Sequence, residues 1–362
     1  MNRPRVLYVP NEAGEFRQLG FRGPLANLAA SGQIAAASVF SLQWRILNGG
    51  DPEEHRRNLI RRISSFKPDL VLMQHLGVTG LRTRHFREMR RAARFELIYH
   101  EADPYSRYLH PLPRSAQAAG RAADVVFTIG TGTFRENFVR AGASDVRWSP
   151  HVFEPERYPF RPVMEDPSRE YDVVIVANRN TPRFRGHPNW RDRIRFVELM
   201  QQRFGQRLAI YGRGWEGIGA KGAIDFSMQN QAIRSAWVSA NWDHYAAEPG
   251  YFSNRLPISL ASGSIHATTR HPGYDKIFPS HTEKFLILQD NIRGLTEDIA
   301  EYLSTTSPAD RIAAAKDAQA FAYKNYRQDG QVVQLLNAKS TWIDPVGASL
   351  RRDDSLPRLD EM

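Results

Sequence analysis

The chain has 362 residues, a length that favours two domains, and its 41% hydrophobic and 24% charged residues are typical of a globular protein. It contains no cysteine, which excludes disulfides, thiolate metal sites and cysteine nucleophiles. A count of 49 Lys and Arg against 39 Asp and Glu gives a net charge of +10, and nearly all the basic residues are arginine. This charge fits an anionic ligand, polymer or membrane surface, and it equally fits the solvated basic surface that an arginine-favouring genome produces.

The N-terminal residues lead directly into a strand-like run, and no apolar stretch approaches the roughly 20 residues that cross a bilayer. We therefore expect a cytoplasmic protein without an integral membrane segment, able to lie at the periphery of an anionic surface.

The first half alternates short apolar runs with helical patterns, which predicts a parallel sheet covered by helices on both faces. The predicted strands are 6–10, 36–42, 69–74, 95–100, 124–130 and 146–150. The predicted helices include 52–66, 83–93 and 134–141. After these elements, the segment 149–167 carries five prolines among its 19 residues and is predicted to be an interdomain linker.

The second half repeats the alternation and predicts another doubly wound sheet. Its predicted strands are 172–177, 207–211, 238–242, 264–268 and 284–288, and its predicted helices are 190–204, 254–261, 292–304 and 308–326. A final helix is expected at 330–339, and the charged segment 344–362 is expected to be disordered. We thus divide the chain into residues 1–155 with a C-terminal helix at about 329–343, and residues 168–328.

Ligands of open α/β sheets bind where the strands end, so the loops after the strands hold the candidate binding residues. In the second half these loops include 178–185, with Arg179 and Arg183, and 270–273, with His271. The loop 212–217 reads G-x-G-x-x-G, but no helical pattern begins at its third glycine, so we do not interpret it as a dinucleotide fingerprint. It is either a glycine-rich loop near a ligand or a surface turn.

The stretch 251–263 has capping residues, a helical apolar run and a terminal glycine. A helix beginning with Ser253, Asn254 and Arg255 offers free N–H groups, a dipole and a guanidinium to a diphosphate. The alternative is a capped core helix with a solvated arginine.

The order I-Y-G-R-G-W (210–215), S-N-R-x-x-x-x-L-A-S-G (253–263) and H-P-G-Y-D-K-I-F (271–278) resembles the group-1-like glycosyltransferases, especially the branch related to spore-maturation glycosyltransferases. The resemblance covers roughly residues 120 to 330. It implies the GT-B fold, in which two Rossmann-like doubly wound α/β domains face each other across a cleft and a C-terminal helix crosses back to the first domain. It also implies that the second domain holds a nucleotide-diphosphate sugar.

Carried over by position, the resemblance matches Arg255 to the arginine before the family's helix, Gly263 to its small-residue turn and Gly273 to the glycine of its second loop. Tyr211 and Gly212 match the strand-end pair. We expect Arg213 to assist at the diphosphate and Trp215 or Tyr211 to line the nucleotide pocket. The chain departs from the family at Ile258, where many relatives have a glutamate expected to hold the donor ribose, and Asp275 lies near a second acidic position.

In the first half, His75 follows one predicted strand, and Glu101 and Asp103 follow the next. An acceptor hydroxyl needs a base if the reaction inverts, so these three are the catalytic candidates, with Asp103 and His75 leading. Each has a plain structural alternative, a packed imidazole for His75 and a turn before Pro104 for Asp103. The acceptor side is expected to involve a further set of loop residues, namely Asn11, Glu12, Gly14 and Thr131.

There is no D-x-D motif, and His266 and His271 have no third ligand at a suitable spacing. We therefore predict a metal-independent glycosyltransferase without a cofactor, using a nucleotide-sugar, UDP-linked by expectation, as co-substrate. The acceptor is a hydroxyl of a glycan or lipid-linked glycan, or, as an alternative suggested by the charge, a nucleic acid. An alternative of another class is a non-catalytic module that binds a nucleotide or glycan.

Overall fold

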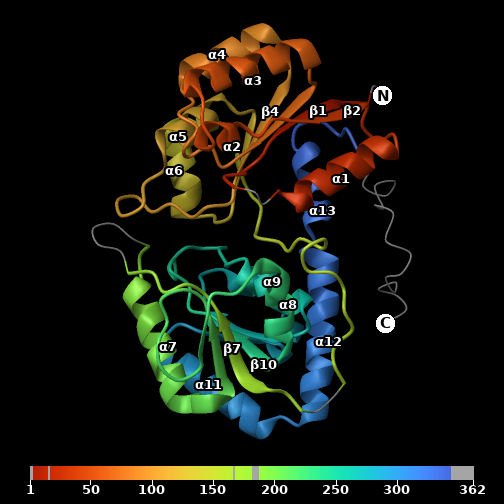
Figure 1. Ribbon diagram of the computed structural model, residues 1–362. Helices are drawn as coiled ribbons and strands as arrows, with labels where there is room; N and C mark the ends of the chain where they lie inside the picture. Colours follow the sequence, from red (N-terminus) through yellow and green to blue (C-terminus); the bar gives the residue numbers. More distant parts are fainter. Residues whose placement is uncertain (1–2, 15–16, 166–167, 182–186, 344–362) are drawn as a thin grey trace. The chain divides into compact units, whose positions relative to one another are not determined.

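A computed structural model describes residues 3–14, 17–165, 168–181 and 187–343, and residue contacts divide them into two units. Unit 1 contains residues 3–150 and 328–343, and unit 2 contains residues 151–327 (Figure 1). Each unit is a six-stranded, wholly parallel sheet with helices packed on it. The prediction of two doubly wound α/β sheets is therefore confirmed.

The sheet of unit 1 has the strand order β2-β1-β3-β4-β5-β6. Its strands are β1 (Arg5–Val9), β2 (Ala36–Val39), β3 (Leu70–Gln74), β4 (Glu96–Glu101), β5 (Val125–Thr128) and β6 (Val146–Trp148). Its helices are α1 (Leu19–Ala30), α2 (Leu42–Leu47), α3 (Pro52–Phe66), α4 (Thr83–Ala92), α5 (Arg114–Ala122), α6 (Thr133–Ala141) and α13 (Gln328–Leu336). The chain adds β2 on one side of β1 and then crosses over to add β3 on the other side. Such a reversal of strand order opens a crevice at the carboxyl ends of β1 and β3.

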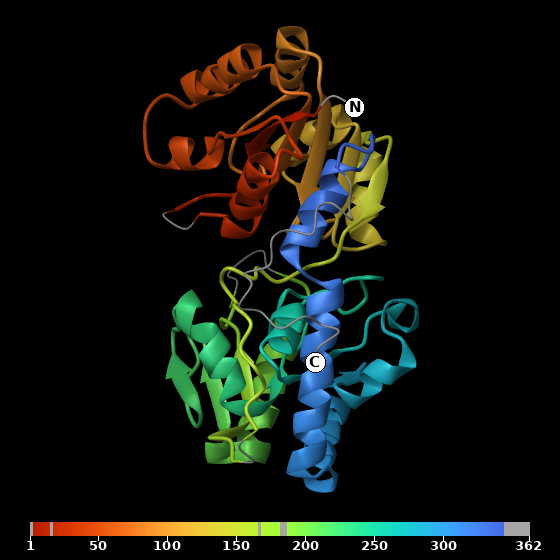
Figure 2. The same ribbon diagram turned by 90° about the vertical axis from the view of Figure 1, so that its right-hand side faces the viewer.

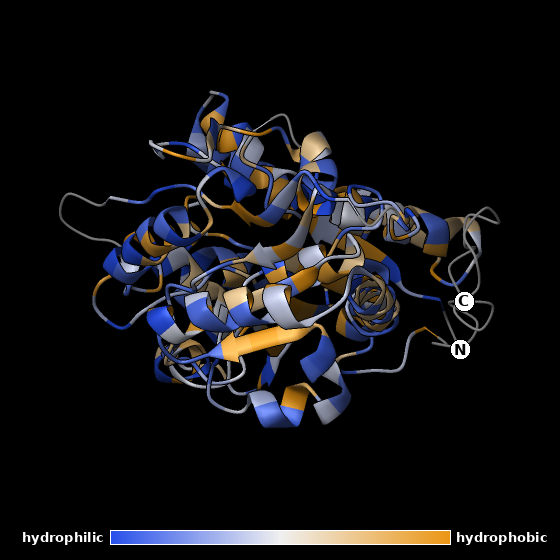
Figure 3. Cartoon of the chain, turned by 90° about the horizontal axis from the view of Figure 1, so that it is seen from below, coloured by the Kyte–Doolittle hydropathy of each residue, from blue (hydrophilic) through white to orange (hydrophobic). Residues whose placement is uncertain are grey.

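Alternation along β1 explains the two cores of unit 1. Val6 and Tyr8 pack on one face with α1 and α13, whereas Leu7 and Val9 pack on the other with residues of α3, α4 and α5. Successive side chains of a strand point to opposite faces, so an apolar strand serves both cores. Figure 3 shows the helices banded in blue and orange, as expected when one side of each helix is apolar.

The C-terminal helix α13 returns to unit 1, as predicted. It contacts α1, beside which it lies in Figures 1 and 2, and it buries Val332, Leu335 and Leu336 in the core on that face of the sheet. Gln331 anchors its first turn by donating from Nε2 to Ser149 Oγ (2.9 Å) and to the Pro150 carbonyl (2.8 Å). The last helix is therefore part of the first core.

The sheet of unit 2 has the order β12-β11-β10-β7-β8-β9. Its strands are β7 (Tyr171–Val176), β8 (Leu208–Tyr211), β9 (Ala220–Gly222), β10 (Ala236–Ala240), β11 (Ile265–Thr269) and β12 (Leu286–Gln289). Its α-helices are α7 (Trp190–Phe204), α8 (Phe226–Arg234), α9 (Arg255–Ala261), α10 (Tyr274–Ile277), α11 (Ile292–Thr305) and α12 (Pro308–Asn325), with 3₁₀ turns η1 (Gly205–Arg207) and η2 (Ser280–Lys284). The strands β8 and β9 are added on one side of β7, and β10, β11 and β12 are added on its other side. The topological switch therefore lies between β7 and β10.

Some elements differ from the sequence prediction. The strand predicted at 36–42 ends at Val39, and Leu42 already begins α2. Helices α1, α5 and α8 and the short strand β9 were not predicted. The helix α1 contains Pro24, a residue that usually interrupts helices, but its Phe21, Leu25 and Leu28 bury one face, and this packing outweighs the local preference. The segment 344–362, predicted to be disordered, lies outside the described residues.

Candidate functional site

Unit 2 contains a cavity of about 560 Å³ at the carboxyl ends of β7 and β8, beside the start of α9. This is the edge of the sheet where doubly wound folds bind ligands. Five of the predicted donor-binding residues line it, namely Tyr211, Gly212, Arg213, Asn254 and Arg255. Ile258, the position at which the chain departs from the resembled family, lines it as well. Residues that follow strand ends therefore form part of the lining of this cavity.

Gly212 permits the close approach of two strand ends on which the cavity depends. Its φ is 146°, and a Cβ atom there would lie 2.0 Å from the Ala177 carbonyl oxygen, so no other residue fits without moving the backbone. The Ala177 carbonyl also accepts a hydrogen bond from Trp215 Nε1 (2.5 Å). As predicted, no helix follows the third glycine of the loop, because the chain continues into β9.

Arg255 is a half-buried cation of the cavity lining. Its Nε donates to the Val176 carbonyl (2.7 Å), and its Nη1 donates to Ser253 Oγ (2.9 Å). No carboxylate of the described residues lies within ion-pair distance of it. The guanidinium is therefore oriented by neutral groups while its charge is left for an anion, which Arg forks bind well.

Of the other predicted donor-side residues that the structure describes, Arg179, Trp215, Gly263 and Gly273 do not line the cavity. Arg213 and Arg179 are exposed, and Arg179 stacks over the Trp215 ring at 6.0 Å, while Trp215 itself is buried. Gly263 follows the far end of α9 and packs against Val163, and Gly273 begins α10. Asp275 is exposed and does not line the cavity. Arg183 lies outside the described residues.

His271 belongs to a buried polar network at the ends of β10 and β11. Its Nε2 lies 3.0 Å from Asp243 Oδ2, and its Nδ1 lies 3.3 Å from the Glu248 carbonyl oxygen. Burial opposes ionisation of Asp243, but the hydrogen bond from His271 and the charges of His271, Arg193 and Arg255 outweigh it and hold the pKa of Asp243 well below its usual range. Because both ring nitrogens of His271 contact the protein, this network fixes the loop that begins at His271.

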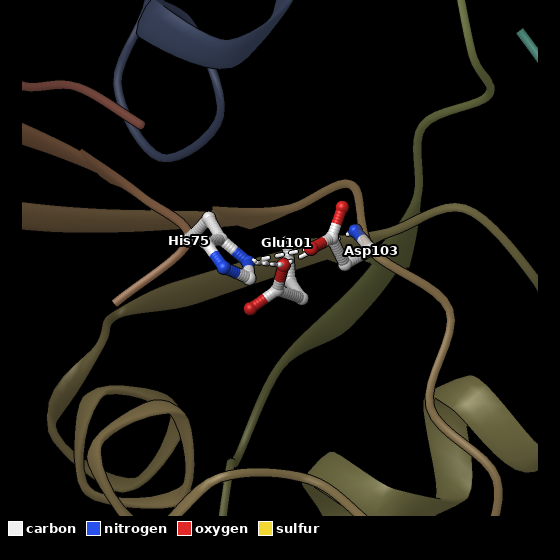
Figure 4. Close-up of side chains that lie close together, drawn as sticks. All are labelled: His75, Glu101 and Asp103. Carbon is white, nitrogen blue, oxygen red and sulfur yellow. Dashed lines mark hydrogen bonds and ion pairs between the residues drawn. The ribbon is translucent and has the colours of Figure 1, made fainter. Parts of the chain in front are cut away.

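The three catalytic candidates of unit 1 meet at the carboxyl ends of β3 and β4, as Figure 4 shows. His75 Nδ1 lies 3.0 Å from Glu101 Oε1 and 3.0 Å from Asp103 Oδ2. His75 has a φ of 37°, an uncommon backbone conformation for a residue other than glycine. The two loops therefore bring one imidazole and two carboxylates together.

The three residues of this cluster differ in their exposure to solvent and in the hydrogen bonds that they already make. Glu101 has no exposed side-chain area, and it accepts hydrogen bonds from Tyr99 OH (2.6 Å) and the Asp103 backbone N–H (3.1 Å) in addition to its contact with His75. The side chain of Asp103 is 47% exposed and that of His75 is 16% exposed. Asp103 is thus the carboxylate that an incoming acceptor can reach.

Burial alone would lower the pKa of His75, but the hydrogen bond to Glu101 and the charges of Glu101 and Asp103 outweigh it and raise the pKa of His75 to about 9. The imidazole is therefore protonated at neutral pH. One atom from each of the three residues also lies within 4.8 Å of the others, a grouping that can hold a metal ion if the imidazole loses its proton.

The predicted acceptor-side residues are in unit 1 after β1 and β5. Glu12 is buried, with Arg22 Nε and Nη2 donating to its two oxygens at 2.6 Å each, and Ser41 Oγ donating at 2.6 Å. These contacts fix the loop after β1. Asn11 is half-buried, and Gly14 and Thr131 are exposed.

Some residues of the cavity, which come from the proline-rich segment and from α8, were not predicted from the sequence. Glu154, Arg157 and Tyr158 line one side of the cavity, and Phe226 and Gln229 of α8 line another. Glu154, Arg157 and Tyr158 belong to the segment that was predicted to be a linker, and no strand end or helix start in the sequence marks them as binding residues.

Residues 191–337 match the protein family described as "Glycosyl transferase-like". No curated protein matches the chain in sequence. In structure, the chain is similar to HepE from Anabaena in complex with UDP and glucose, with a TM-score of 0.60 and 15% identity over 93% of this chain and 100% of that one. It is also similar to sucrose-phosphate synthase from Thermosynechococcus elongatus (TM-score 0.60, 15% identity, 93% and 98% covered) and to the lipopolysaccharide outer core galactosyltransferase WaaB (TM-score 0.56, 10% identity, 92% and 99% covered). Within the described residues, no helix combines the length and apolarity that spanning a membrane requires.

Proposed function

From the match of residues 191–337 to the glycosyl transferase-like family and from the GT-B fold of the chain, we propose that the protein is a glycosyltransferase. It transfers a sugar from a nucleoside-diphosphate sugar to an acceptor hydroxyl. The observation that carries the proposal is the cavity of unit 2, where the guanidinium of Arg255 lies beside the ends of β7 and β8 and forms no ion pair with a carboxylate of the described residues. HepE, a structural relative, binds UDP and glucose, which supports a UDP-linked donor here.

In this proposal Arg255 binds the diphosphate of the donor. The helix α9 has only seven residues, so its dipole adds little, and the full charge of the guanidinium provides most of the attraction. Arg213, exposed at the rim, assists, and Tyr211 contacts the nucleoside. Arginine neutralises the leaving diphosphate in place of a divalent cation. His271 contributes by holding its loop through Asp243.

The chemical step breaks the bond between the anomeric carbon and a phosphate oxygen, and the bonding electrons leave with the diphosphate. The acceptor oxygen forms the new bond to that carbon. For an inverting reaction, Asp103 takes the proton of the acceptor hydroxyl, because it is the exposed carboxylate of the cluster. Protonated His75 orients Asp103, and Glu101 fixes His75 from the buried side.

The acceptor that we propose is a hydroxyl of a glycan or lipid-linked glycan. WaaB, one of the structural relatives, is a lipopolysaccharide outer core galactosyltransferase, and an acceptor of this class is consistent with that similarity.

The test is incubation of the purified protein, with EDTA present, with UDP-, GDP-, ADP- and TDP-sugars, followed by measurement of free nucleoside diphosphate and of transfer to oligosaccharides. We expect slow hydrolysis of one donor class without acceptor and faster turnover with acceptor. The Asp103→Asn variant should bind that nucleotide normally but lose turnover. Binding without any turnover would show a non-catalytic module, and the absence of both would refute the proposal.

A further inference from the structure

The helix α4 of unit 1 carries a concentrated positive charge. Residues 82–94 contain six arginines and one glutamate, so this segment contributes +5 of the chain's net charge of +10. Arg84, Arg87 and Arg91 are exposed, and their spacing of three and four residues places them on one face of α4. Arg94, which is also exposed, follows the end of the helix. We call these four residues the arginine face.

Most of the arginine face has no partner within the described residues. Arg84 forms an ion pair with Glu53, in which Nη2 and Oε1 lie 3.2 Å apart. Arg87, Arg91 and Arg94 form neither an ion pair nor a side-chain hydrogen bond with any residue that the structure describes. Three positive charges of this surface are therefore left for a ligand outside the chain.

The neighbouring helix α3, which lies beside α4 in Figure 1, shows the opposite arrangement. Its exposed Arg57 and Arg61 lie 3.5 Å from Asp51 and 3.9 Å from Glu54, respectively. In α4, by contrast, no acidic residue occupies the first turn, where a negative charge would favour the helix. Arginines three or four residues apart also repel one another. The charge of α4 therefore costs helix stability, and a negatively charged ligand would offset that cost.

We propose that the acceptor is an acidic glycan, whose carboxylate or phosphate groups bind along the arginine face while one of its hydroxyls reaches Asp103. This inference rests on the proposed function and names the class of its acceptor. The loop that carries His75 leads directly into α4, so the helix begins at the edge of the sheet where the catalytic candidates meet. Arg84 to Arg91 span about 10 Å at about 1.5 Å per residue, which suits an extended chain better than a single small anion.

The same segment lacks the features that a bilayer or a single-stranded nucleic acid uses. An interfacial helix inserts apolar residues into the lipid, but Phe86 and Met89 of α4 are buried in the core, and no large hydrophobic side chain of residues 82–94 is exposed. Bases stack on aromatic side chains, and the only Phe, Tyr or Trp of this segment is the buried Phe86. An acidic glycan needs the charges and hydrogen bonds that guanidinium groups supply.

The experiment measures the binding of two acidic probes to the full-length protein at low and high salt. Oligogalacturonate carries carboxylates, and a phosphomannan oligosaccharide carries phosphates. A maltooligosaccharide is the neutral probe, and anionic phospholipid vesicles and single-stranded DNA are the other polyanions. The test variant is Arg87→Glu/Arg91→Glu.

The matched control is Arg195→Glu/Arg203→Glu, which changes the net charge by the same amount. Both arginines are exposed on α7 of unit 2, do not line its cavity and form no ion pair within the part of the chain that the structure describes. Circular dichroism checks that each variant is folded. The control should hydrolyse the donor at the rate of the wild type.

We expect the wild type to bind at least one acidic probe, but not the maltooligosaccharide, with an affinity that falls as salt rises. The α4 variant should bind that probe about 10-fold more weakly, and the α7 control should stay within about twofold of the wild type. Three results would overturn the inference, namely no binding of either acidic probe, equal losses in the two variants, and tighter binding of vesicles or DNA than of the acidic glycans.

Donor hydrolysis by the wild type without acceptor separates this inference from the proposed function. If the donor is hydrolysed but the arginine face shows no role in binding acidic glycans, the inference fails and the proposed function stands. If no donor is hydrolysed, the proposed function fails, and the assignment of the arginine face to an acceptor fails with it.

Discussion

Replacing Arg255 with alanine tests the charge on which donor binding depends. Nε and Nη1 of Arg255 are aligned by Val176 and Ser253, so the guanidinium needs little reordering to meet a diphosphate. A hydrogen bond to a charged group contributes about 1.5–3 kcal/mol, and each 1.4 kcal/mol changes Kd tenfold. One such bond therefore predicts a loss of about 10- to 150-fold in affinity for the nucleoside diphosphate.

The assay is calorimetric titration of wild type, Arg255→Ala and Arg255→Lys at two salt concentrations. Lysine keeps the charge but not the fork, so we expect an intermediate Kd and a retained salt dependence, which alanine should reduce. Arg207→Ala is the control, because Arg207 is paired with Asp172 (2.8 Å) and does not line the cavity. A Kd for Arg255→Ala within about twofold of wild type, in a folded protein, would refute the reasoning.

Three further predictions concern the scaffold. Gly212→Ala should abolish nucleotide binding, measured by thermal shift with and without ligand, because its Cβ would lie 2.0 Å from the Ala177 carbonyl oxygen. Leu335→Ala should destabilise unit 1 by about 2–5 kcal/mol in urea denaturation, because Leu335 is fully buried in the core that α13 completes. Asp243→Asn should lower the melting temperature and weaken donor binding together, because it leaves His271 without its charged partner, and a change in neither would contradict the role of the network.

The sequence predicted the fold well because both sheets consist of buried parallel strands. The runs 70–73 (L-V-L-M) and 173–177 (V-V-I-V-A) are apolar throughout, and this signal does not depend on distant contacts. The sequence did not predict α1, because Pro24 disfavours a helix and only the packing of Phe21 and Leu25 on the sheet explains why one forms. Helix α5 was missed for a related reason, since its buried face consists of serine, alanine and glycine, which give little hydrophobic contrast.

The candidate site was predictable where it follows strand ends. The sequence predicts His75, Glu101 and Asp103 from their places at strand ends, and the pairing of β3 with β4 brings each of the two carboxylates to 3.0 Å from His75. Glu154 belongs to no strand or helix, and its place in the cavity depends on the contacts of its neighbour Phe153 with Tyr326 and Tyr323, about 170 residues later in the chain. No local pattern encodes such contacts.

The pKa of His75 predicts how stability and turnover depend on pH, and the pH dependence of turnover distinguishes Asp103 from His75 as the base. The pKa of His75 rises from 6.5 to about 9, which corresponds to about 3 kcal/mol of folding free energy when the imidazole is protonated. Because the folded-state pKa is the higher one, this stabilisation is complete below pH 6.5 and is lost as the pH rises through about 9. Urea denaturation of wild type should show that loss, and His75→Gln should not.

The same titration governs turnover in opposite directions for the two mechanisms. If Asp103 is the base and protonated His75 orients it, turnover falls as the pH rises through about 9, and His75→Gln removes this alkaline limb. If His75 is the base, turnover instead rises up to about pH 9, because only the neutral imidazole accepts a proton. Glu101→Gln should move either limb to lower pH, because Glu101 is the main group that raises the pKa of His75. A rising limb in the wild type, together with an active Asp103→Asn variant, would assign the base to His75 and refute the role proposed for Asp103.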